Sequence, residues 1–179
     1  MKNSLSVWQL AGITFTAVLG TILHFLYEWT GNSPFFALFS AVNESTWEHM
    51  KLFFFPALIF AVVQSIFFYE EYKSFWWIKL IGILAGLFLI PTLFYTVNGI
   101  FGKTPDWLNI LFFFVSVGTA YLIEYFLFKK DFAFDKLPAL PIALLALVAF
   151  GFFLFTFLPP KLPVFQDPIT GTYGVYQIK

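Results

Sequence analysis

The sequence predicts an all-α membrane protein, a polytopic bundle of about five transmembrane helices. Of its 179 residues, 60% are hydrophobic and 11% are charged, which is about half the charged fraction of an ordinary soluble domain. The 28 Phe and 6 Trp residues are more than a soluble domain of this size can bury. Several apolar runs reach the ~20 residues that a helix needs to cross the ~30 Å of hydrocarbon in a bilayer.

Five spans can be placed from the lengths of the apolar runs, and each should be helical because backbone groups in lipid must be bonded within the chain. The expected spans are about 6–29, 47–69, 77–98, 107–128 and 138–158. Between the first two, Ser33 can cap and Pro34 can begin a short outer interfacial helix over about 34–41. A tail, 159–179, follows the last span. We expect residues 1–179 to form a single integral membrane domain.

The lysines predict an orientation, because cytoplasmic loops of membrane proteins carry an excess of basic residues. An odd number of spans puts the two termini on opposite sides. With the N-terminus inside, the cytoplasmic side carries Lys2, Lys73, Lys79, Lys129, Lys130 and Lys136, and the outer side carries Lys51, Lys103, Lys161 and Lys179. Glu124 is expected to snorkel to the cytoplasmic surface. We therefore expect a multi-pass protein of the cell membrane with a cytoplasmic N-terminus and an extracytoplasmic C-terminus.

Composition also argues against several partners and chemistries. The chain has no Arg and a formal net charge of zero, so it lacks the basic face that binding to nucleic acid requires. It has no Cys, which removes disulfides, thiolate ligands and a cysteine nucleophile. The expected partner is the lipid bilayer, and the oligomeric state is left open.

Both histidines lie near the same membrane surface with carboxylates beside them. His24 and Glu28 are four residues apart at the end of the first span, and Ser45 and His49 are four apart at the start of the second. Each pair therefore shares one helical face. Consecutive spans run antiparallel, and at ~1.5 Å per residue each imidazole lies roughly 5–8 Å inside the outer end. The sequence predicts that the two imidazoles meet.

These side chains predict a metal site. Neutral imidazole is a good ligand for zinc or iron, and carboxylate oxygens and water can complete the shell. We expect His24, Glu28 and His49 to hold a divalent metal, zinc first and iron second. Glu44 or Glu48 can then take the proton from a metal-bound water. An ionisable group inside an apolar run is costly unless it is paired or faces water, which favours a functional role.

A structural reading competes for part of this set. Ser45-x-x-Glu48 matches a capping box, in which Ser45 accepts from the backbone amide of Glu48 while the Glu48 side chain reaches back. A carboxylate in a first turn also suits the helix dipole, and Trp47 is typical of an interfacial anchor. Capping accounts for Ser45 and Glu48, and for Glu44 in part, but not for the two histidines or Glu28.

Long motifs give a family resemblance. The segments "LHFLYEWTGNSPFFALFSAVNESTWEHMKLFFFP", "IPTLFYT" and "DPITGTYG" resemble an uncharacterised bacterial multi-pass membrane family that is classed only as a domain of unknown function. The resemblance covers essentially the whole chain. It implies a membrane location and little about activity.

A second, local resemblance concerns Ser45-x-x-x-His49. This element is similar to one in the seven-helix membrane metallohydrolases that include alkaline ceramidases and adiponectin-receptor-like proteins, where three histidines hold zinc. The resemblance implies that His24-x-x-x-Glu28 stands in for their later His-x-x-x-His pair, and it adds Ser45 to the candidate catalytic residues. The chain departs from that pattern in having five expected spans, a Glu in place of a His, and the pair on its first span.

The leading interpretation is a membrane-embedded metal-dependent enzyme, a hydrolase of a lipid or another amphipathic substrate. One alternative is a small ion- or proton-coupled transporter, in which the same carboxylates and imidazoles bind an ion. That alternative needs a polar path leading inward, and five spans do not divide into the two equal halves of many transporters. Another alternative is a non-catalytic membrane scaffold whose polar cluster locks the first two helices together.

Overall fold

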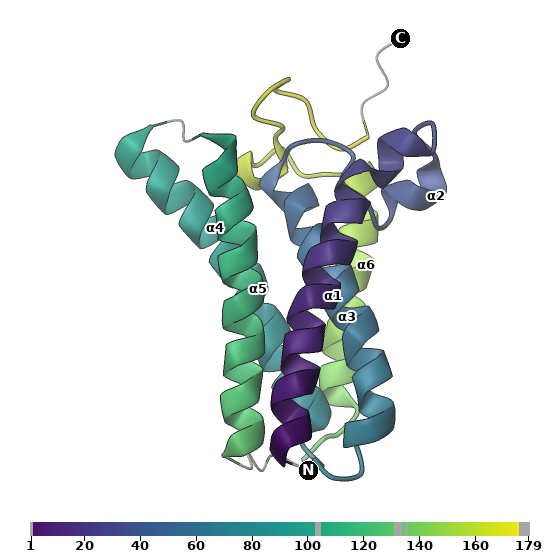
Figure 1. Ribbon diagram of the computed structural model, residues 1–179. Coiled ribbons are helices and arrows are strands. Elements are labelled where there is room, and N and C mark those ends of the chain that lie inside the picture. Colours follow the sequence, from purple (N-terminus) through teal and green to yellow (C-terminus); the bar gives the residue numbers. More distant parts are fainter. Residues whose placement is uncertain (1, 103–104, 131–133, 135, 176–179) are drawn as a thin grey trace.

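Five long helices dominate the computed structural model, which describes residues 2–102, 105–130, 134 and 136–175 (Figure 1). The long helices are α1 (Lys2–Trp29), α3 (Thr46–Phe68), α4 (Phe75–Phe101), α5 (Asp106–Lys129) and α6 (Leu140–Phe157), and the short ones are α2 (Pro34–Ala37) and the 3-10 turn η1 (Pro163–Phe165). Each long helix is long and apolar enough to cross a membrane. The predicted fold class, an all-helical bundle with five candidate membrane spans, is confirmed.

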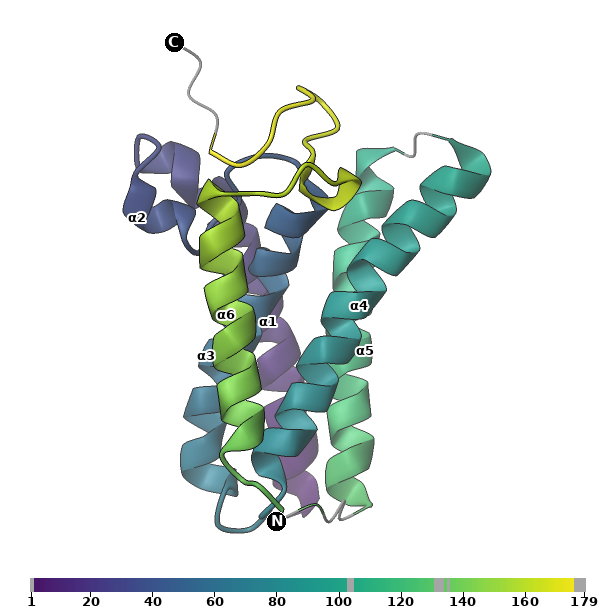
Figure 2. The same ribbon diagram turned by 180° about the vertical axis from the view of Figure 1, so that it is seen from behind.

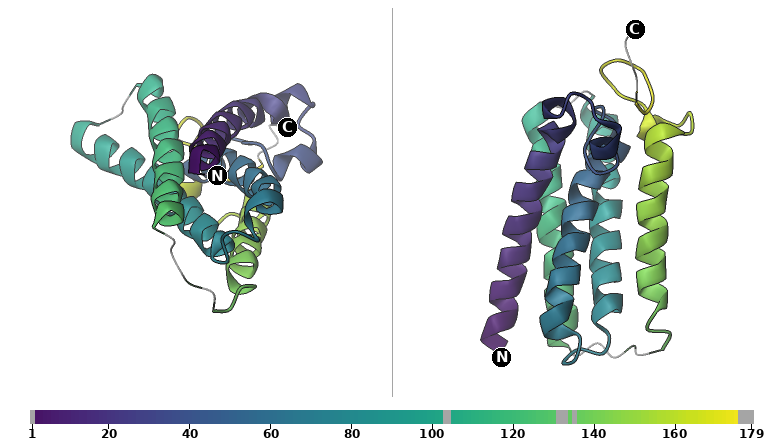
Figure 3. Two further views of the ribbon diagram at one scale, coloured as in Figure 1. Left: turned by 60° about the horizontal axis from the view of Figure 1, so that its bottom comes forward. Right: turned by 90° about the vertical axis from the view of Figure 1, so that its right-hand side faces the viewer.

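Successive long helices run in alternating directions, so the N-terminus and the tail after α6 lie at opposite ends of the bundle (Figures 1 and 3). We call the end with the N-terminus the inner end and the opposite end the outer end. α1 packs chiefly against α3, and α4 chiefly against α5. Toward its outer end α4 leans away from α6 (Figure 2), and Pro91 within α4 removes one intrahelical hydrogen bond in that part.

The outward faces of the helices carry large apolar side chains. Strongly exposed examples from several helices are Val7, Leu10, Ile66, Phe88, Ile110 and Leu147. In water such a surface favours aggregation, whereas hydrocarbon tails cover it at no cost. The exposed faces thus agree with a multi-pass membrane protein.

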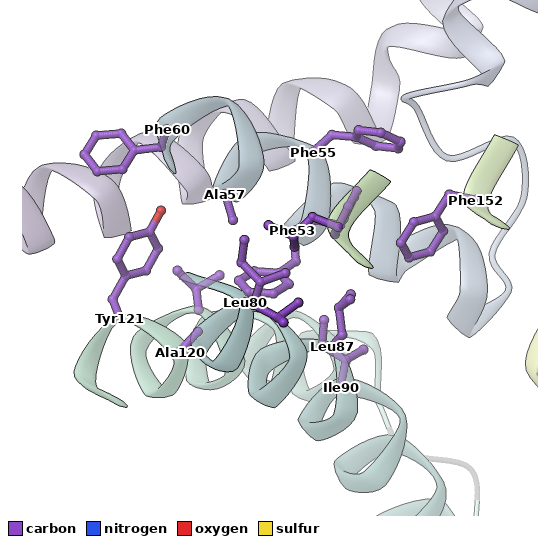
Figure 4. Packing of buried hydrophobic residues seen from close by; sticks show 14 residues of the cluster. Phe53, Phe55, Ala57, Phe60, Leu80, Leu87, Ile90, Ala120, Tyr121 and Phe152 are labelled. Atoms are coloured by element: carbon purple, nitrogen blue, oxygen red, sulfur yellow. The ribbon is translucent and has the colours of Figure 1, made fainter. Parts of the chain in front are cut away.

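The interior is built mainly from aromatic and aliphatic side chains of α3, α4, α5 and α6 (Figure 4). Phe53 is fully buried and Phe152 is nearly so. Gly86 allows this packing, because a Cβ at that position would overlap the Phe53 ring. α3 is therefore the central helix of the bundle, with buried residues along most of its length.

The segment between α1 and α3 turns back onto α1 and carries part of the site described below. α2 is a four-residue helix that ends before the expected residue 41. The chain leaves the helix because the Ser40 hydroxyl donates to the carbonyl oxygen of Leu23 and accepts from the backbone amide of Tyr27 at 3.1 Å. These two bonds hold the following loop against the outer end of α1.

Trp47, near the start of α3, is half-buried and packs against aromatic side chains of α6 and η1. Its ring centroid lies 4.6 Å from that of Phe152 on α6 and 4.7 Å from that of Phe165 in η1. The tail after α6 folds over the outer end, where the Asn43 side-chain amide donates to the carbonyl oxygen of Gly174 at 3.0 Å. The aromatic contacts of Trp47 therefore attach the tail to α3.

Two lysines and a glutamate that we expected at the membrane surfaces are buried inside the bundle. Lys51 on α3 pairs with Glu48 at 2.6 Å, and Lys79 on α4 pairs with Glu124 on α5 at 2.6 Å. The prediction that Glu124 snorkels is wrong, because Lys79 offers it a partner within the bundle. Removing Lys51 and Lys79 takes one lysine from each side, so the bias that predicts the orientation is unchanged.

Candidate metal centre

The two histidines meet at the outer end of α1 and α3, as the depth argument predicts. One ligand atom from each of His24, Glu44 and His49 lies within 4.8 Å of the other two. The Nε2 atom of His24 is 3.8 Å from Oε1 of Glu44, and Nε2 of His49 is 3.4 Å from Oε2 of Glu44. The imidazole centroids are 5.3 Å apart. Two imidazoles and a carboxylate therefore converge on one point.

His49 is oriented by the start of its own helix. Its Nδ1 lies 3.0 Å from the carbonyl oxygen of Ser45. A carbonyl only accepts, so Nδ1 carries a proton and Nε2 faces Glu44. In the protonated imidazole Nε2–H donates to the Glu44 carboxylate, and loss of that proton leaves a lone pair of Nε2 on the same side. Metal-binding histidines use this arrangement, in which one ring nitrogen donates to an outer partner and the other is free for the metal.

His24 is oriented by packing. Its Nδ1 atom is buried and has no hydrogen-bond partner within the described part of the chain. The ring lies 4.8 Å from the Phe25 ring, between centroids, and against His49. Its side chain is about one-third exposed, at 31%. The Nε2 atom of His24 is thus directed to the shared carboxylate without an outer partner on the other nitrogen.

Glu44 supplies the carboxylate from the loop before α3, outside the candidate spans. A hydrogen bond with His49 lowers the pKa of Glu44 below its ordinary value of 4.5; burial opposes this, and both imidazoles add to the lowering. Glu44 is therefore ionised at neutral pH, which is the form that binds a cation.

The donor set fits a borderline transition metal. Imidazole nitrogen with carboxylate oxygen suits zinc and non-haem iron. Ligand atoms around a tetrahedral zinc with bonds of ~2.1 Å stand ~3.4 Å apart. The Glu44–His49 separation already has that length, whereas His24 has to come closer, because it lies 3.8 Å from Glu44 and the three ligand atoms lie within 4.8 Å of one another.

The chain matches a known protein family. A model of a family of unknown function, DUF6512, matches residues 1–175. The chain belongs to the DUF6512 family. No curated protein and no solved structure gives a significant match. The expected membership of an uncharacterised family is confirmed.

In this DUF6512 protein Glu28 stands beside the ligand group and outside it. A pocket of about 170 Å³ opens at the candidate metal site, and the residues that line it include His24, Phe25, Tyr27, Glu28, Ala41, Val42, Asn43 and Glu44. Glu28 is exposed, and it is not among the three residues whose ligand atoms converge. It is thus a free carboxylate on the wall of the pocket.

Ser45 caps α3 as the sequence predicts, since its hydroxyl accepts from the Glu48 amide at 3.4 Å. The other half of the capping box differs. The backbone amide of Ser45 bonds to Oδ1 of Asn43 at 2.9 Å, and the Glu48 carboxylate accepts from the backbone amide of Val42 at 3.1 Å. Asn43 thus accepts the hydrogen bond from the Ser45 amide that we expected Glu48 to accept, and the Glu48 side chain binds the Val42 amide instead.

Lys51 is the residue at this end of the DUF6512 bundle that sequence reasoning missed. Besides its ion pair with Glu48, its Nζ donates to the carbonyl oxygen of Ala37 at 2.8 Å and to the Thr156 hydroxyl at 2.9 Å. It therefore ties α2, α3 and α6 together behind the loop that carries Glu44. The sequence feature that indicates this ion pair is the i, i+3 spacing of Glu48 and Lys51 at the start of an apolar run.

Proposed function

We propose that this protein is a membrane-embedded metal-dependent hydrolase in which His24, Glu44 and His49 hold a divalent transition metal, zinc first and iron second. The observation that supports it is the convergence of three ligand atoms within 4.8 Å. The bond of Nδ1 to Ser45 supports it further, because in neutral His49 it places the lone pair of Nε2 on the side of Glu44. An ordinary ion pair of Glu44 with His49 does not require a second imidazole beside it.

The proposal assigns the carboxylates by their surroundings. A bound divalent metal lowers the pKa of a coordinated water and polarises a substrate carbonyl. Glu28 lies on the pocket wall one helical turn from His24, where it would serve as the general base toward such a water. Glu44, which the sequence suggested as a base, becomes a ligand. Ser45 and Glu48, the other catalytic candidates, position the loop and the helix start.

The substrate class follows from the size and place of the pocket. At about 170 Å³ it is smaller than the ~300–1,000 Å³ of pockets that enclose a drug-sized ligand. A reacting group can enter, while the rest of the substrate stays outside. Beside it, the exposed rings of Phe25 and Trp29 stack with their centroids 5.7 Å apart. An amphipathic molecule with its polar end in the pocket and its apolar part in the bilayer suits this surface.

The hydrolase proposal is tested with purified protein in lipid nanodiscs and a panel of long-chain esters and amides. We expect hydrolysis that a chelator abolishes and zinc restores. The Glu28→Gln variant should keep its metal and lose turnover, and short-chain water-soluble analogues should be poor substrates. Turnover that survives complete metal removal, or that is unchanged in Glu28→Gln, would contradict the proposal.

A second candidate, a proton- or cation-coupled transporter, is favoured by the ion pair of Lys79 and Glu124 in the inner half of the bundle. Charged groups inside membrane spans often mark ion pathways. The apolar core around Phe53 and Leu87 lies between this pair and the metal centre. Solute or proton flux into proteoliposomes that depends on both Glu28 and Glu124 would favour transport over hydrolysis.

A further inference from the structure

A second group of polar side chains lies in the inner half of the bundle, one on each of four helices. Lys79 on α4 donates to Glu124 on α5 at 2.6 Å, and their side chains are 1% and 3% exposed. Gln9 on α1 and Gln64 on α3 are also buried. Each of the four lies four or five residues from the inner end of its apolar span. At ~1.5 Å per residue, all four share one layer ~6–8 Å inside that end.

The two glutamines have hydrogen-bonding capacity that the protein does not use. Both side-chain polar atoms of Gln64 are buried and have no partner among the described residues. The Gln9 side-chain amide approaches the Glu124 carboxylate as a donor, and its amide oxygen is buried without a partner in the described part of the chain. Gln64 lies one turn beyond Phe60 on the same face of α3, and the Phe60 ring centroid is 5.8 Å from Nζ of Lys79. Gln9 therefore borders the ion pair, and Gln64 lies in the same layer of the bundle.

The ion pair has unused capacity as well. The Lys79 ammonium has three N–H donors and gives one to Glu124. It also lies over aromatic rings, with Nζ 5.1 Å from the Tyr121 centroid and 5.9 Å from that of Phe75. The Tyr121 hydroxyl is bonded to Thr16 at 2.8 Å. Ring faces attract the cation, but they do not replace the hydrogen bonds that the ammonium makes in water.

The surrounding helices are shaped to hold this group. A Cβ at Gly82 would overlap the Glu124 side chain, and a Cβ at Gly12 would overlap the rings of Tyr121 and Phe60. Both glycines thus leave space where the polar layer lies. A buried polar group without a partner costs about 1–3 kcal/mol, and proteins usually meet that cost with ordered water.

Water can reach the layer from the inner end more easily than from the outer end. On the inner side one small apolar cluster covers it, which includes Leu5, Phe68, Phe75 and Phe128. On the outer side lies the main aromatic core. A path from the inner solution crosses a single apolar layer, whereas a path from the outer side crosses most of the bundle.

We propose that Gln9, Gln64, Lys79 and Glu124 line an internal water site, in which bound water completes the hydrogen bonds of both amides and of the ion pair and exchanges with the inner solution. Such a site combines a proton donor, a proton acceptor and water inside the membrane. This is the composition of intramembrane proton-binding sites. The proposal is independent of the metal centre.

The chain has no cysteine, so single-cysteine variants of the full protein in nanodiscs can test it. The probe is the silver ion, which is small enough to follow water and reacts with the thiolate, a form that apolar surroundings suppress. Gln64→Cys is compared with Ile66→Cys, which lies on the lipid-facing side of α3 at a similar depth. We expect Gln64→Cys to react at least ~10-fold faster, because its thiol can ionise in water.

A further variant tests whether the Gln64→Cys thiol reacts with water that is present in the wild type or with water that enters the void left by the substitution. Phe53→Cys creates a larger void in the apolar core and should stay as slow as Ile66→Cys. The proposal is overturned when folded Gln64→Cys reacts no faster than Ile66→Cys, or when Phe53→Cys reacts as fast as Gln64→Cys. If Gln64→Cys does not fold, Gln9→Cys against the lipid-facing Leu10→Cys gives the same comparison on α1.

Discussion

The Nδ1 atom of His49 and the carbonyl oxygen of Ser45 lie 3.0 Å apart, and this bond determines what the outer polar cluster can do. The first carbonyl groups of a helix accept bonds from the turn that follows, and Ser45 also accepts from the backbone amide of His49 at 3.2 Å. The same residue caps α3 with its hydroxyl. Ser45 thus starts the helix and turns Nε2 of His49 toward Glu44, the orientation that the proposed metal site requires.

The two carboxylates near the histidines should have separable roles. Glu44→Gln removes a ligand, so we expect zinc affinity to fall by more than the ~10–100-fold that losing an outer-shell partner costs. Glu28→Gln should leave zinc affinity within a few-fold of the wild type. Competition titrations with a chromophoric chelator measure both. An equal loss of zinc affinity in the two variants would show that Glu28 is a metal ligand, as the sequence suggests.

Zinc binding should weaken below neutral pH because protons compete for the imidazoles. The pKa of Glu44 is lowered by its bond to His49, so Glu44 stays ionised over this range and does not contribute to the loss. The fall follows protonation of the two imidazoles and approaches ~10-fold per pH unit for each histidine. Titrations between about pH 7.5 and 5.5 measure it. An affinity that stays constant over this range would exclude the imidazoles as ligands.

The lowered pKa of Glu44 also predicts how the stability of the metal-free protein depends on pH. Because the folded-state pKa of Glu44 is lowered, its stabilising interaction with the histidines is complete above its unfolded pKa near 4.5 and is lost as the pH falls through the lowered folded value. Glu44→Gln should remove this part of the acid sensitivity. Melting temperatures of the two proteins at neutral and acidic pH give the comparison. Identical pH profiles would show that the carboxylate makes no net interaction.

Lys51 should matter for folding more than any surface lysine. Lys51→Met leaves the Glu48 carboxylate buried without its cation, which costs about 3–5 kcal/mol in soluble proteins. Thermal unfolding in detergent should show a large drop, and Lys51→Met with Glu48→Gln should recover part of it. Lys73→Met breaks an exposed pair with Glu70 and serves as the matched control, with almost no expected change.

Gly82 should not tolerate a side chain. Gly82→Ala forces the Glu124 side chain away from its place, and overpacking of this kind costs about 1–3 kcal/mol. Gly118→Ala is the control, because nothing lies within 4 Å of a Cβ at that helical position. Melting temperatures of both variants in one detergent test the prediction, which fails if the two shift alike.

The sequence was sufficient to predict the fold class, because long apolar runs indicate membrane spans and a span in lipid has to satisfy its own backbone hydrogen bonds as a helix. The same depth argument brought His24 and His49 together. Lys79 and Glu124 also lie at matching depths on neighbouring spans, so the same reasoning predicts their ion pair. Their charge alone favours the membrane surface instead.

The residues of the candidate metal site could not be derived from helical spacing alone. Glu28 shares a face with His24 on α1, yet the carboxylate that reaches both imidazoles is Glu44. Its place depends on the bonds of Ser40 to α1 and on the bond between Glu48 and Val42. These contacts join distant parts of the chain, and they position a loop for which no periodicity exists.

Elemental analysis of the purified protein tests the central claim most directly. We expect close to one equivalent of zinc or iron per chain in the wild type. The double variant His24→Ala, His49→Ala should contain almost none, while remaining folded as judged by its melting curve and elution volume. Wild-type protein without stoichiometric metal after purification from metal-supplemented cells, or a double variant that keeps its metal, would contradict the metal centre.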